Sequence, residues 1–474
     1  MMKYVKVKYL CFLPLAVSCV GRDMFAQERS GAFMQSEEMV AAPAGASREA
    51  RVYTVSPLQK WVDALQPGDT LRVPSGKYSG NLRLTKRLTV IGENWPALSA
   101  DFQGSVIEIT ADSCEIRGLI IQSSGRRLTD EDAGILVQSR GNRLIGNRLR
   151  DILFGIYLYE ASSNLIADND IEGLRELDLG GRGSGVHLWN CRDNRLSNNR
   201  IAHTRDGIYV QYAPATVITN NEISEVRYGL HYMYSDSNTF IDNTFSNSLA
   251  GAAIMYSNRI VFKRNRFMQN RDFAAFGLLF QDCRFCVADS NLLADNGIGI
   301  FLEAGGQNMF RNNRIVGNDV AVEIFSSTDK NVFTNNSFED NRSPLFLVGK
   351  RTGTVWDENG VGNYWSGYDG YDLDADGIGD VPYRIQNIFD FIESRHPSLR
   401  LFLESPASQA LAAATKTFPI FDISQEQDEH PRMQRLNFSL ERFSGSITNS
   451  LPETFSALSV VVISLVLLRR RYRF

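Results

Sequence analysis

The feature that most constrains this chain is an internal repeat of about 22 residues between Ala133 and Glu339. In each repeat a Gly stands before a short apolar run, and an Asn follows at a nearly constant distance. The Asn residues are Asn147, Asn169, Asn199, Asn221, Asn243, Asn265, Asn291, Asn313 and Asn336. A repeat of this length is one coil of a parallel β-helix, whose coils bury their apolar sides only against each other. We therefore predict an all-β chain with a right-handed parallel β-helix over residues 51–350.

Alternation along the apolar run gives each strand two faces. Positions +1 and +3 after the Gly are apolar, as in Ile156 and Leu158, and the period of two puts them on one side of a strand. That side is predicted to face the interior. The repeated Asn is expected in a turn with left-handed backbone, which Asn tolerates best after Gly. The stacked amides are expected to hydrogen-bond as a ladder along the coils.

Two insertions interrupt the repeat, one between Asn169 and Gly185 and the other between Asn265 and Gly277. The spacing from Gly to the next Asn stays nearly constant, so both insertions fall in the same turn of the coil. We expect them to project from one edge, where insertions in a solenoid often flank the binding surface.

The N-terminal segment has the layout of an export signal. A basic start precedes an apolar run over residues 9–20, which predicts a secretory signal over residues 1–26 and a flexible linker over residues 27–50. An alternative for the same segment is a lipoprotein box with Cys19 as the acylated residue. Either alternative predicts that the protein leaves the cytoplasm.

The C-terminal end carries a short apolar stretch over residues 455–468, followed by three Arg. It is shorter than a bilayer core, but arginines that reach the membrane surface and local thinning can make up the difference. The stretch is therefore a candidate membrane anchor. An apolar helix packed on protein is the alternative.

Composition excludes one class of partner. The net charge is −4 and the pI is near 5.9, whereas a nucleic-acid-binding protein would show a basic face. We predict no nucleic-acid partner.

The outward positions of the repeated strand carry residues that a solvated strand rarely shows. Position +2 holds His187 and His231, and position +4 holds Met233 and Met255. Coil stacking should place Met233 beside Met255, with His231 two residues away and His187 two coils away. Thioether and imidazole donors suit Cu(I) and do not suit Mg²⁺ or Ca²⁺. On an exposed face these four residues predict a weak, transient copper site, or else a surface that grips a partner protein.

Two other interpretations of this face stay open. A loop or the C-terminal region could cover it, which would favour a structural role. Aromatic faces also suit a polysaccharide-binding or polysaccharide-modifying β-helix. Acid–base chemistry needs clustered catalytic groups, however, and the nearest approach is Glu303 with Glu323, without an evident basic partner. We therefore predict that the chain is not an enzyme.

An acidic loop follows the last coil. Its acidic residues match the front of a calcium loop, and Gly377 stands where such a loop turns sharply: Asp372, Asp374, Asp376 and Asp380. Tyr383 occupies the position of the bidentate Glu, so a complete EF-hand is not expected. A structural calcium turn is predicted, and a plain Asp/Gly turn is the alternative.

The cysteines give weaker indications. Cys283 and Cys286 form a CxxC that could close as a disulfide in an oxidising compartment. Cys114 is isolated and predicts an interior filler.

The run over residues 362–372, GNYWSGYDGYD, continues into DGIGDVPY over residues 376–383. Both closely resemble the signature of the NosD family, periplasmic β-helix proteins needed to mature nitrous oxide reductase. The resemblance covers most of residues 51–384, with the signature and the acidic loop in 351–384. The first coil, near residues 64–78, also resembles that of pectate-lyase-like β-helices.

The resemblance implies a non-enzymatic role in building the copper centres of nitrous oxide reductase. It implies three partners: an ABC transporter with permease and ATPase subunits, a copper chaperone and the reductase. Residues 385–450 look like the family's docking region and are predicted to form a small, mostly helical segment. The motif names no copper ligands, so the His and Met positions depend on the repeat alone.

Overall fold

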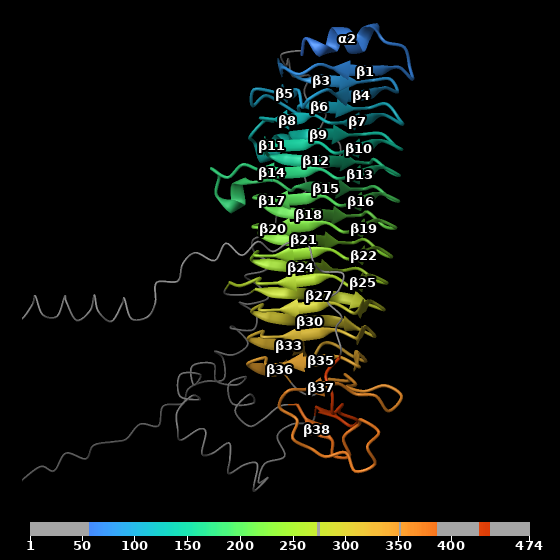
Figure 1. Cartoon of the computed structure of the whole chain (residues 1–474), viewed down its shortest axis with the longest axis vertical. Helices are drawn as coiled ribbons and strands as arrows, with labels where there is room; N and C mark the ends of the chain where they lie inside the picture. Colours follow the sequence, from blue (N-terminus) through green and yellow to red (C-terminus); the bar gives the residue numbers. More distant parts are fainter. Residues whose placement is uncertain (1–55, 273–274, 350–351, 386–425, 437–474) are drawn as a thin grey trace, which may run out of the picture. The chain divides into compact units, whose positions relative to one another are not determined.

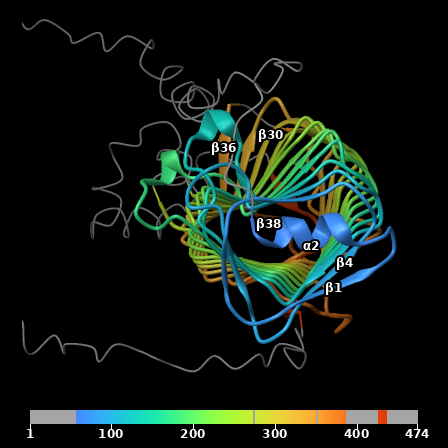
Figure 2. The same ribbon diagram turned by 90° about the horizontal axis from the view of Figure 1, so that it is seen from above.

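A computed structural model describes residues 56–272, 275–349, 352–385 and 426–436. Its strands are stacked in successive coils, and each coil gives one strand to each of three parallel sheets (Figures 1 and 2). Among the described residues the first, second and third sheets hold 12, 13 and 12 strands. The predicted parallel β-helix is confirmed.

The strands of each sheet follow one another in the order of the coils. The first sheet contains β1 (Thr70–Val73), β4 (Thr89–Gly92), β7 (Glu115–Arg117), β10 (Arg143–Ile145), β13 (Leu165–Ala167), β16 (Arg195–Ser197), β19 (Val217–Thr219), β22 (Thr239–Ile241), β25 (Val261–Lys263), β28 (Val287–Asp289), β31 (Met309–Arg311) and β34 (Val332–Thr334). The second contains β2 (Lys77–Ser79), β5 (Ala97–Ser99), β8 (Ile120–Gln122), β11 (Arg148–Ile152), β14 (Asp170–Gly173), β17 (Arg200–Ala202), β20 (Glu222–Ser224), β23 (Thr244–Ser246), β26 (Arg266–Met268), β29 (Leu292–Ala294), β32 (Arg314–Val316), β35 (Ser337–Glu339) and β37 (Tyr364–Trp365). The third contains β3 (Leu82–Leu84), β6 (Ile107–Ile109), β9 (Ala133–Val137), β12 (Phe154–Tyr159), β15 (Val186–Trp189), β18 (Asp206–Gln211), β21 (Tyr228–Met233), β24 (Ala250–Met255), β27 (Phe276–Arg284), β30 (Ile298–Gly306), β33 (Val320–Phe325) and β36 (Ser343–Val348).

A few short elements lie outside the three sheets. They are the helix α2 (Leu58–Ala64), the 3₁₀ turns η1 (Leu128–Asp130) and η2 (Leu179–Gly181), and the antiparallel pair β38 (Tyr383–Arg384) and β39 (Gln427–Asp428).

Equivalent positions of successive coils pair directly. Ile208 pairs with Leu230, and Leu230 pairs with Ala252, so residues 22 apart become neighbours. All three side chains are buried in the interior core. The recurring Gly begins this stretch because the chain passes close to the next coil there. A Cβ added at Gly207 would lie 2.3 Å from the side chain of Ile223.

The repeated Asn residues form the predicted ladder. The backbone N–H and Nδ2 of Asn221 donate to Oδ1 of Asn243 at 2.9 and 3.0 Å. Oδ1 of Asn221 accepts the same two bonds from Asn199. The ladder continues beyond the predicted range to Asn363, which accepts from Asn336.

The predicted backbone geometry of the ladder Asn is wrong. The left-handed residue is the one before it, such as Asn220 (φ 54°) or Asp242 (φ 58°), while Asn221 and Asn243 are not left-handed. The ladder Asn is buried and must turn its amide toward the next coil. The preceding residue, at the surface of the coil, therefore adopts the left-handed backbone conformation.

Stacked Asn residues, which were not predicted, occur in the other two turns as well. The turn between the second and third sheets contains Asn270, Asn296, Asn318 and Asn341. The turn between the third and first sheets contains Asn142, Asn164 and Asn194, and further along Asn308 and Asn331. All three turns of the coil are therefore fixed to neighbouring coils by side-chain amides.

The two ends of the stack are closed differently. At the N-terminal end α2 lies over the first coil and buries Leu58 and Val62 (Figure 1). This helix was not predicted, although the two apolar residues are four apart. At the other end the ring of Trp365 stacks on Phe338, with centroids 4.1 Å apart.

Two acidic residues fix the C-terminal cap. Oδ2 of Asp428 accepts from Nε1 of Trp365 at 2.9 Å and from the backbone N–H of Asn363 at 2.7 Å. Burial raises the pKa of Asp428 to about 6. Glu426 accepts from Nε1 of Trp356 at 2.9 Å. The described residues 426–436 thus close the last coil of their own chain.

Several predictions fall on other parts of the chain. The signal (1–26), the linker (27–50) and the candidate anchor (455–468) lie outside the described residues. So do 386–425 and 437–450 of the predicted docking segment. The described part of that segment has the short strand β39 and turns where a mostly helical segment was predicted.

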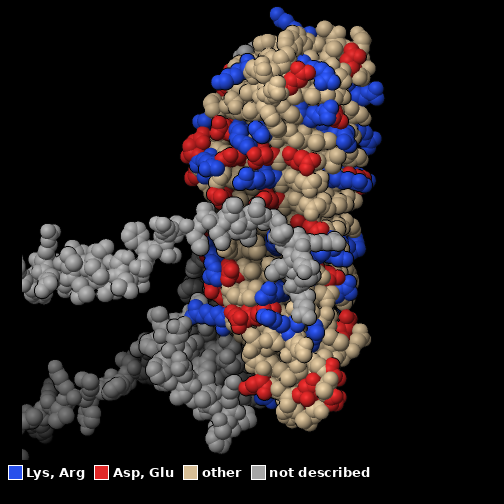
Figure 3. Space-filling model, in the orientation of Figure 1, with Lys and Arg blue, Asp and Glu red and all other residues tan. Residues whose placement is uncertain are grey.

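Charge is mixed on the face drawn in Figure 3. Among the described residues there, basic and acidic side chains are interspersed along the coils, without a large patch of either sign.

Replacing Asn221 with Ala should lower the unfolding midpoint markedly. The change removes one rung and leaves buried donors of Asn199 without an acceptor, at a cost of about 1–3 kcal/mol for each unsatisfied group. Denaturant unfolding followed by circular dichroism measures the effect. Glu222→Ala, at the exposed neighbouring residue, should leave the midpoint nearly unchanged. Equal midpoints for the two variants would contradict a stabilising role for the ladder.

Candidate functional site

The outer face of the third sheet holds the residues predicted to bind copper. Met233 on β21 pairs with Met255 on β24, and His231 is two residues from Met233 on the same strand. His187 pairs with Tyr209, which pairs with His231, so the two imidazoles are two coils apart. The structure brings the four residues into the predicted arrangement.

The face is not exposed, which corrects the prediction of an open site. His231 is 3% exposed, Met255 5% and His187 8%, while Met233 is half-buried. In-register stacking places large side chains against one another along each column of this face. Any ligand of these residues would therefore lie in a largely desolvated place.

Two apolar clusters flank the buried histidines. The first lies toward the N-terminal coils and contains Ala133, Leu136, Leu153, Phe154, Tyr157 and Leu174. The second lies toward the C-terminal coils and contains Tyr228, Ala250, Ala253, Met255, Phe276 and Leu279, with Met233 packed against it. Met255 thus belongs to an apolar cluster on the face that also holds His231.

Aromatic rings connect the two histidines. His187 stacks on Tyr209 with centroids 4.3 Å apart, and the Tyr209 ring meets His231 edge-on at 4.9 Å. The Tyr209 hydroxyl donates to Oε1 of Gln211 at 2.8 Å. Nδ1 of His187 has no hydrogen-bond partner within the described part of the chain. His187 is therefore separated from the His231–Met group by one phenol ring.

Asp206 is the charged centre of this face, and it was not predicted. It is fully buried. Its Oδ2 lies 3.3 Å from Nδ1 of His231 and 3.1 Å from Nε of Arg205. Its Oδ1 lies 3.1 Å from Nε of Arg227. The carboxylate therefore joins two guanidinium groups to one imidazole.

The sequence did contain an indication of Asp206. The residue before the repeated Gly is apolar in most coils, as at Phe154, Tyr228 and Phe276. A single Asp in that column is an exception. Asp206 lies outside positions +2 and +4, the two columns from which the copper residues were predicted.

The charges of this cluster decide its protonation. Burial alone would raise the pKa of Asp206, but the hydrogen bond and charge of His231 and the guanidinium groups of Arg227 and Arg205 outweigh burial. The pKa of Asp206 therefore lies well below its usual range. Burial, reinforced by the charge of Arg205, lowers the pKa of His187 to about 3. His187 is thus neutral at neutral pH, the form in which imidazole binds metals.

The donor set fits Cu(I). Two thioethers and an imidazole are soft to intermediate ligands, and none of the three is the hard oxygen donor that Mg²⁺ or Ca²⁺ requires. The half-buried Met233 is the most accessible of the three donors. His231, Met233 and Met255 are the residues that would hold the ion.

Three tyrosines form a stack beside the Met pair. Tyr212, Tyr234 and Tyr256 have nearly parallel rings with centroids 5.4 and 5.1 Å apart. Tyr212 and Tyr234 are each nearly half exposed. The ring faces within the stack cover one another, so those faces are not available to stack on a sugar. This arrangement does not favour the polysaccharide-binding alternative.

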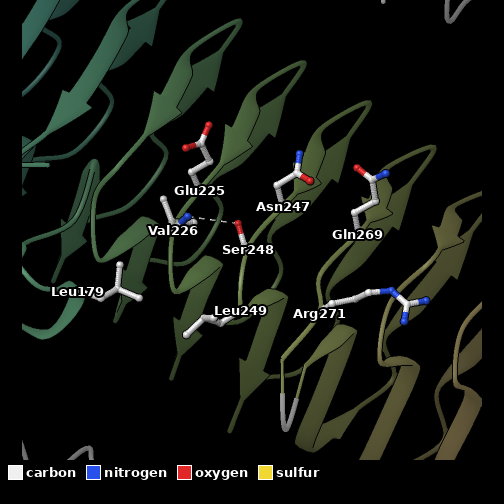
Figure 4. A pocket seen from close by; sticks show the side chains of 8 residues that line it. All are labelled: Leu179, Glu225, Val226, Asn247, Ser248, Leu249, Gln269 and Arg271. Atoms are coloured by element: carbon white, nitrogen blue, oxygen red, sulfur yellow. Dashed lines mark hydrogen bonds between the residues drawn. The ribbon is translucent and has the colours of Figure 1, made fainter. Parts of the chain in front are cut away.

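The two insertions project from the same turn, as predicted. Each connects a strand of the second sheet to a strand of the third, β14 to β15 and β26 to β27. A shallow depression of about 420 Å³ lies between them, with Leu179 from the first insertion and Arg271 from the second (Figure 4). Its other lining residues are Glu225, Val226, Asn247, Ser248, Leu249 and Gln269. None of the four predicted copper residues lines this depression.

The cysteines in the described residues are all free and buried. Cys283 and Cys286 do not form the disulfide that their CxxC spacing allowed. Cys114 fills the interior as predicted. Burial raises the pKa of Cys191 to about 12, so this thiol is not poised for reaction.

Three of the four predicted calcium ligands are close together. Carboxylate oxygens of Asp372, Asp374 and Asp376 lie within 4.8 Å of one another. Asp380 is outside this group, and its Oδ2 accepts from the backbone N–H of Leu373 at 2.7 Å. The loop has the left-handed turn that a calcium loop requires at Gly377 (φ 89°).

Comparison with known proteins assigns the chain to a family. A family model described as periplasmic copper-binding protein (NosD) matches residues 174–370. A curated relative from Pseudomonas aeruginosa, named probable ABC transporter binding protein NosD, is 36% identical over 376 residues, which are 76% of this chain and 87% of that protein. The chain belongs to the NosD family. A relative of the same name from Stutzerimonas stutzeri is 30% identical over 380 residues, 77% of this chain and 86% of its own.

Solved structures give weaker likenesses. The Family 28 exopolygalacturonase of Yersinia enterocolitica has a TM-score of 0.44 and 12% identity, and the match covers 64% of this chain and 74% of that chain. A mutant of the periplasmic alginate epimerase AlgG has a TM-score of 0.41 and 13% identity, over 58% of this chain and 66% of its own. Likenesses at this level carry no argument about ligand or reaction.

The NosD match includes the candidate site. Residues 174–370 contain all four predicted copper residues, Asp206 and the first part of the signature, residues 362–370. The family description is periplasmic and copper-binding, in agreement with the predicted compartment and metal. Within the described residues no helix is long and apolar enough to cross a membrane, and Cys19 lies outside them.

The buried neutral His187 predicts a dependence of stability on pH. The pKa of His187 is about 3 in the fold and near 6.5 in the unfolded chain. Its contribution to stability is therefore complete above pH 6.5 and is lost progressively as the pH falls toward 3. His187→Phe keeps a stacking ring without a titrating group. This variant should lose less stability between pH 7 and pH 4 than the wild type.

Denaturant midpoints measured at several pH values test this expectation. His203→Asn is the matched control, because His203 has a left-handed backbone that Asn tolerates. If the His187→Phe and wild-type profiles have the same slope, the stability does not depend on a neutral His187.

Proposed function

We propose that this protein is a periplasmic accessory protein that helps supply copper for the maturation of nitrous oxide reductase and itself catalyses no covalent chemistry. The observation that carries the proposal is the group of His231, Met233 and Met255 on adjacent strands of one sheet. Such a donor set suits Cu(I), and the chain belongs to a family described as periplasmic and copper-binding.

The chemistry of the donors suits a carrier. Thioethers bind Cu(I) without a formal negative charge, so the ion is held less firmly than by thiolates. Met233 and Met255 have flexible side chains that can follow the ion during transfer. The surrounding apolar cluster keeps water away from the ion. His187, one coil beyond Tyr209, would serve as a relay or as a contact for a partner.

The relatives' names support the proposed partners. Both are named ABC transporter binding proteins, which favours a complex with the permease and ATPase subunits of such a transporter. In this scheme a copper chaperone delivers the ion and nitrous oxide reductase receives it. Cys19 or residues 455–468 would keep the protein at the membrane.

Titration with Cu(I) against a competing chelator tests the metal site. The full-length protein should bind Cu(I), and the variant with both Met233→Leu and Met255→Leu should bind it at least 10-fold more weakly. Leu is close to Met in volume, so the packing of the apolar cluster is largely kept.

The control is a second double variant, Met268→Leu with Met309→Leu, on outward positions of the second and first sheets. Its affinity should match that of the wild type. Equal affinity of the Met233/Met255 variant and the wild type would reject the metal site and leave only a docking role for these residues.

We also propose that Asp372, Asp374 and Asp376 hold a structural Ca²⁺. Three carboxylates crowded on one loop repel one another without a cation. A chelator should therefore lower the melting temperature of the wild type, and Asp376→Ala should abolish that sensitivity. Asp340→Ala, outside the loop, should keep it. A chelator-independent melting curve of the wild type would mean that the segment is a plain Asp/Gly turn.

A further inference from the structure

Asp206 and His231 form a carboxylate–imidazole pair beside the proposed copper donors. Oδ2 of Asp206 is 3.3 Å from Nδ1 of His231, and Asp206 is fully buried. Because a carboxylate can only accept, this contact requires a hydrogen on Nδ1 of the imidazole. Metal-binding histidines commonly donate their other ring N–H to a carboxylate in this way.

The positions of Asp206, His231 and the two Met residues along their strands indicate how the His231 ring is oriented. Asp206 begins β18, whereas Met233 and Met255 end β21 and β24. His231 lies between them, two residues before Met233 and one coil beyond Asp206. The two ring nitrogens of imidazole point away from each other. With Nδ1 held toward the start of the strands, Nε2 is directed toward their ends, where the Met side chains lie.

Two arginines hold the carboxylate in place. Nε of Arg227 is 3.1 Å from Oδ1 of Asp206, and Nε of Arg205 is 3.1 Å from Oδ2. Contacts from both sides leave the carboxylate little freedom to rotate. Arg227 is itself fixed over the ring of Tyr228, 4.4 Å from the centroid.

We propose that Asp206 is a positioning residue of the copper site, which fixes the ring of His231 so that Nε2 is the nitrogen presented to Cu(I). The inference rests on the proposed copper function. Asp206 does not touch the metal in this arrangement. It acts through His231, and its loss should weaken binding only where His231 is present.

Nitrogen NMR of the full-length protein labelled with ¹⁵N-histidine tests the orientation directly. The chain has five histidines, so His231 can be assigned by its disappearance in His231→Gln. In the wild type without metal, Nδ1 of His231 should be protonated, and added Cu(I) should shift Nε2. A wild type with an unprotonated Nδ1 and the hydrogen on Nε2 alone would overturn the proposal, whatever the variants do.

The variant Asp206→Asn tests the energetic role. Loss of a partner that orients a ligand typically costs about 10- to 100-fold in metal affinity, and we expect a loss in this range. Combined with His231→Gln, Asp206→Asn should cause no further loss. Asp242→Asn is the matched control, because Asp242 also forms an ion pair with an arginine, Arg264, but far from this face.

The outcomes separate the two proposals. If the Met233/Met255 variant binds Cu(I) as tightly as the wild type, the proposed function is rejected. If Cu(I) binding depends on Met233 and Met255 but Asp206→Asn changes neither the affinity nor the tautomer of His231, only the positioning role of Asp206 is rejected. An equal loss in Asp206→Asn with and without His231 would mean that Asp206 acts on the fold and not through the imidazole.

Discussion

The structure depends on the fixed registration of each coil on the next. A parallel sheet could slip by one residue, and a slip would turn every side chain to the opposite face. The buried Asn ladder prevents this slip because each amide matches the donors and acceptors of its neighbours only in one register. Asn221, for example, joins Asn199 and Asn243 through both backbone and side-chain bonds. Mismatched rungs would leave polar groups buried without partners, which is costly.

Fixed registration turns the outer face of the third sheet into columns. A residue in one coil meets its equivalent in the next, so Met233 meets Met255 and His187 is separated from His231 by the single ring of Tyr209. Large side chains in such columns cover one another. The outer face of a solenoid can therefore be shielded from water without a deep cavity. In the same way a charged residue such as Asp206 can be buried although it lies outside the interior core.

The ends of the stack follow from the same constraint. The last coil exposes an unpaired ladder Asn and unpaired aromatic rings, and the family signature supplies both partners. Asn363 ends the ladder, and Trp365 covers the ring of Phe338. Asp428 then binds both residues from a distant part of the chain. In this chain the signature is, in this respect, a cap that completes the β-helix.

The sequence by itself determined the coil period, the interior columns, the Asn ladder, the edge that carries the insertions and the adjacency of Met233 and Met255. All of these follow from spacing, because residues one period apart must be neighbours in a stack of coils. The tertiary structure alone decided which way each turn bends and how deeply the outer face is buried. It also showed that Asp206 engages His231. These features depend on side chains of several coils packing together in three dimensions, and a one-dimensional repeat does not contain that information.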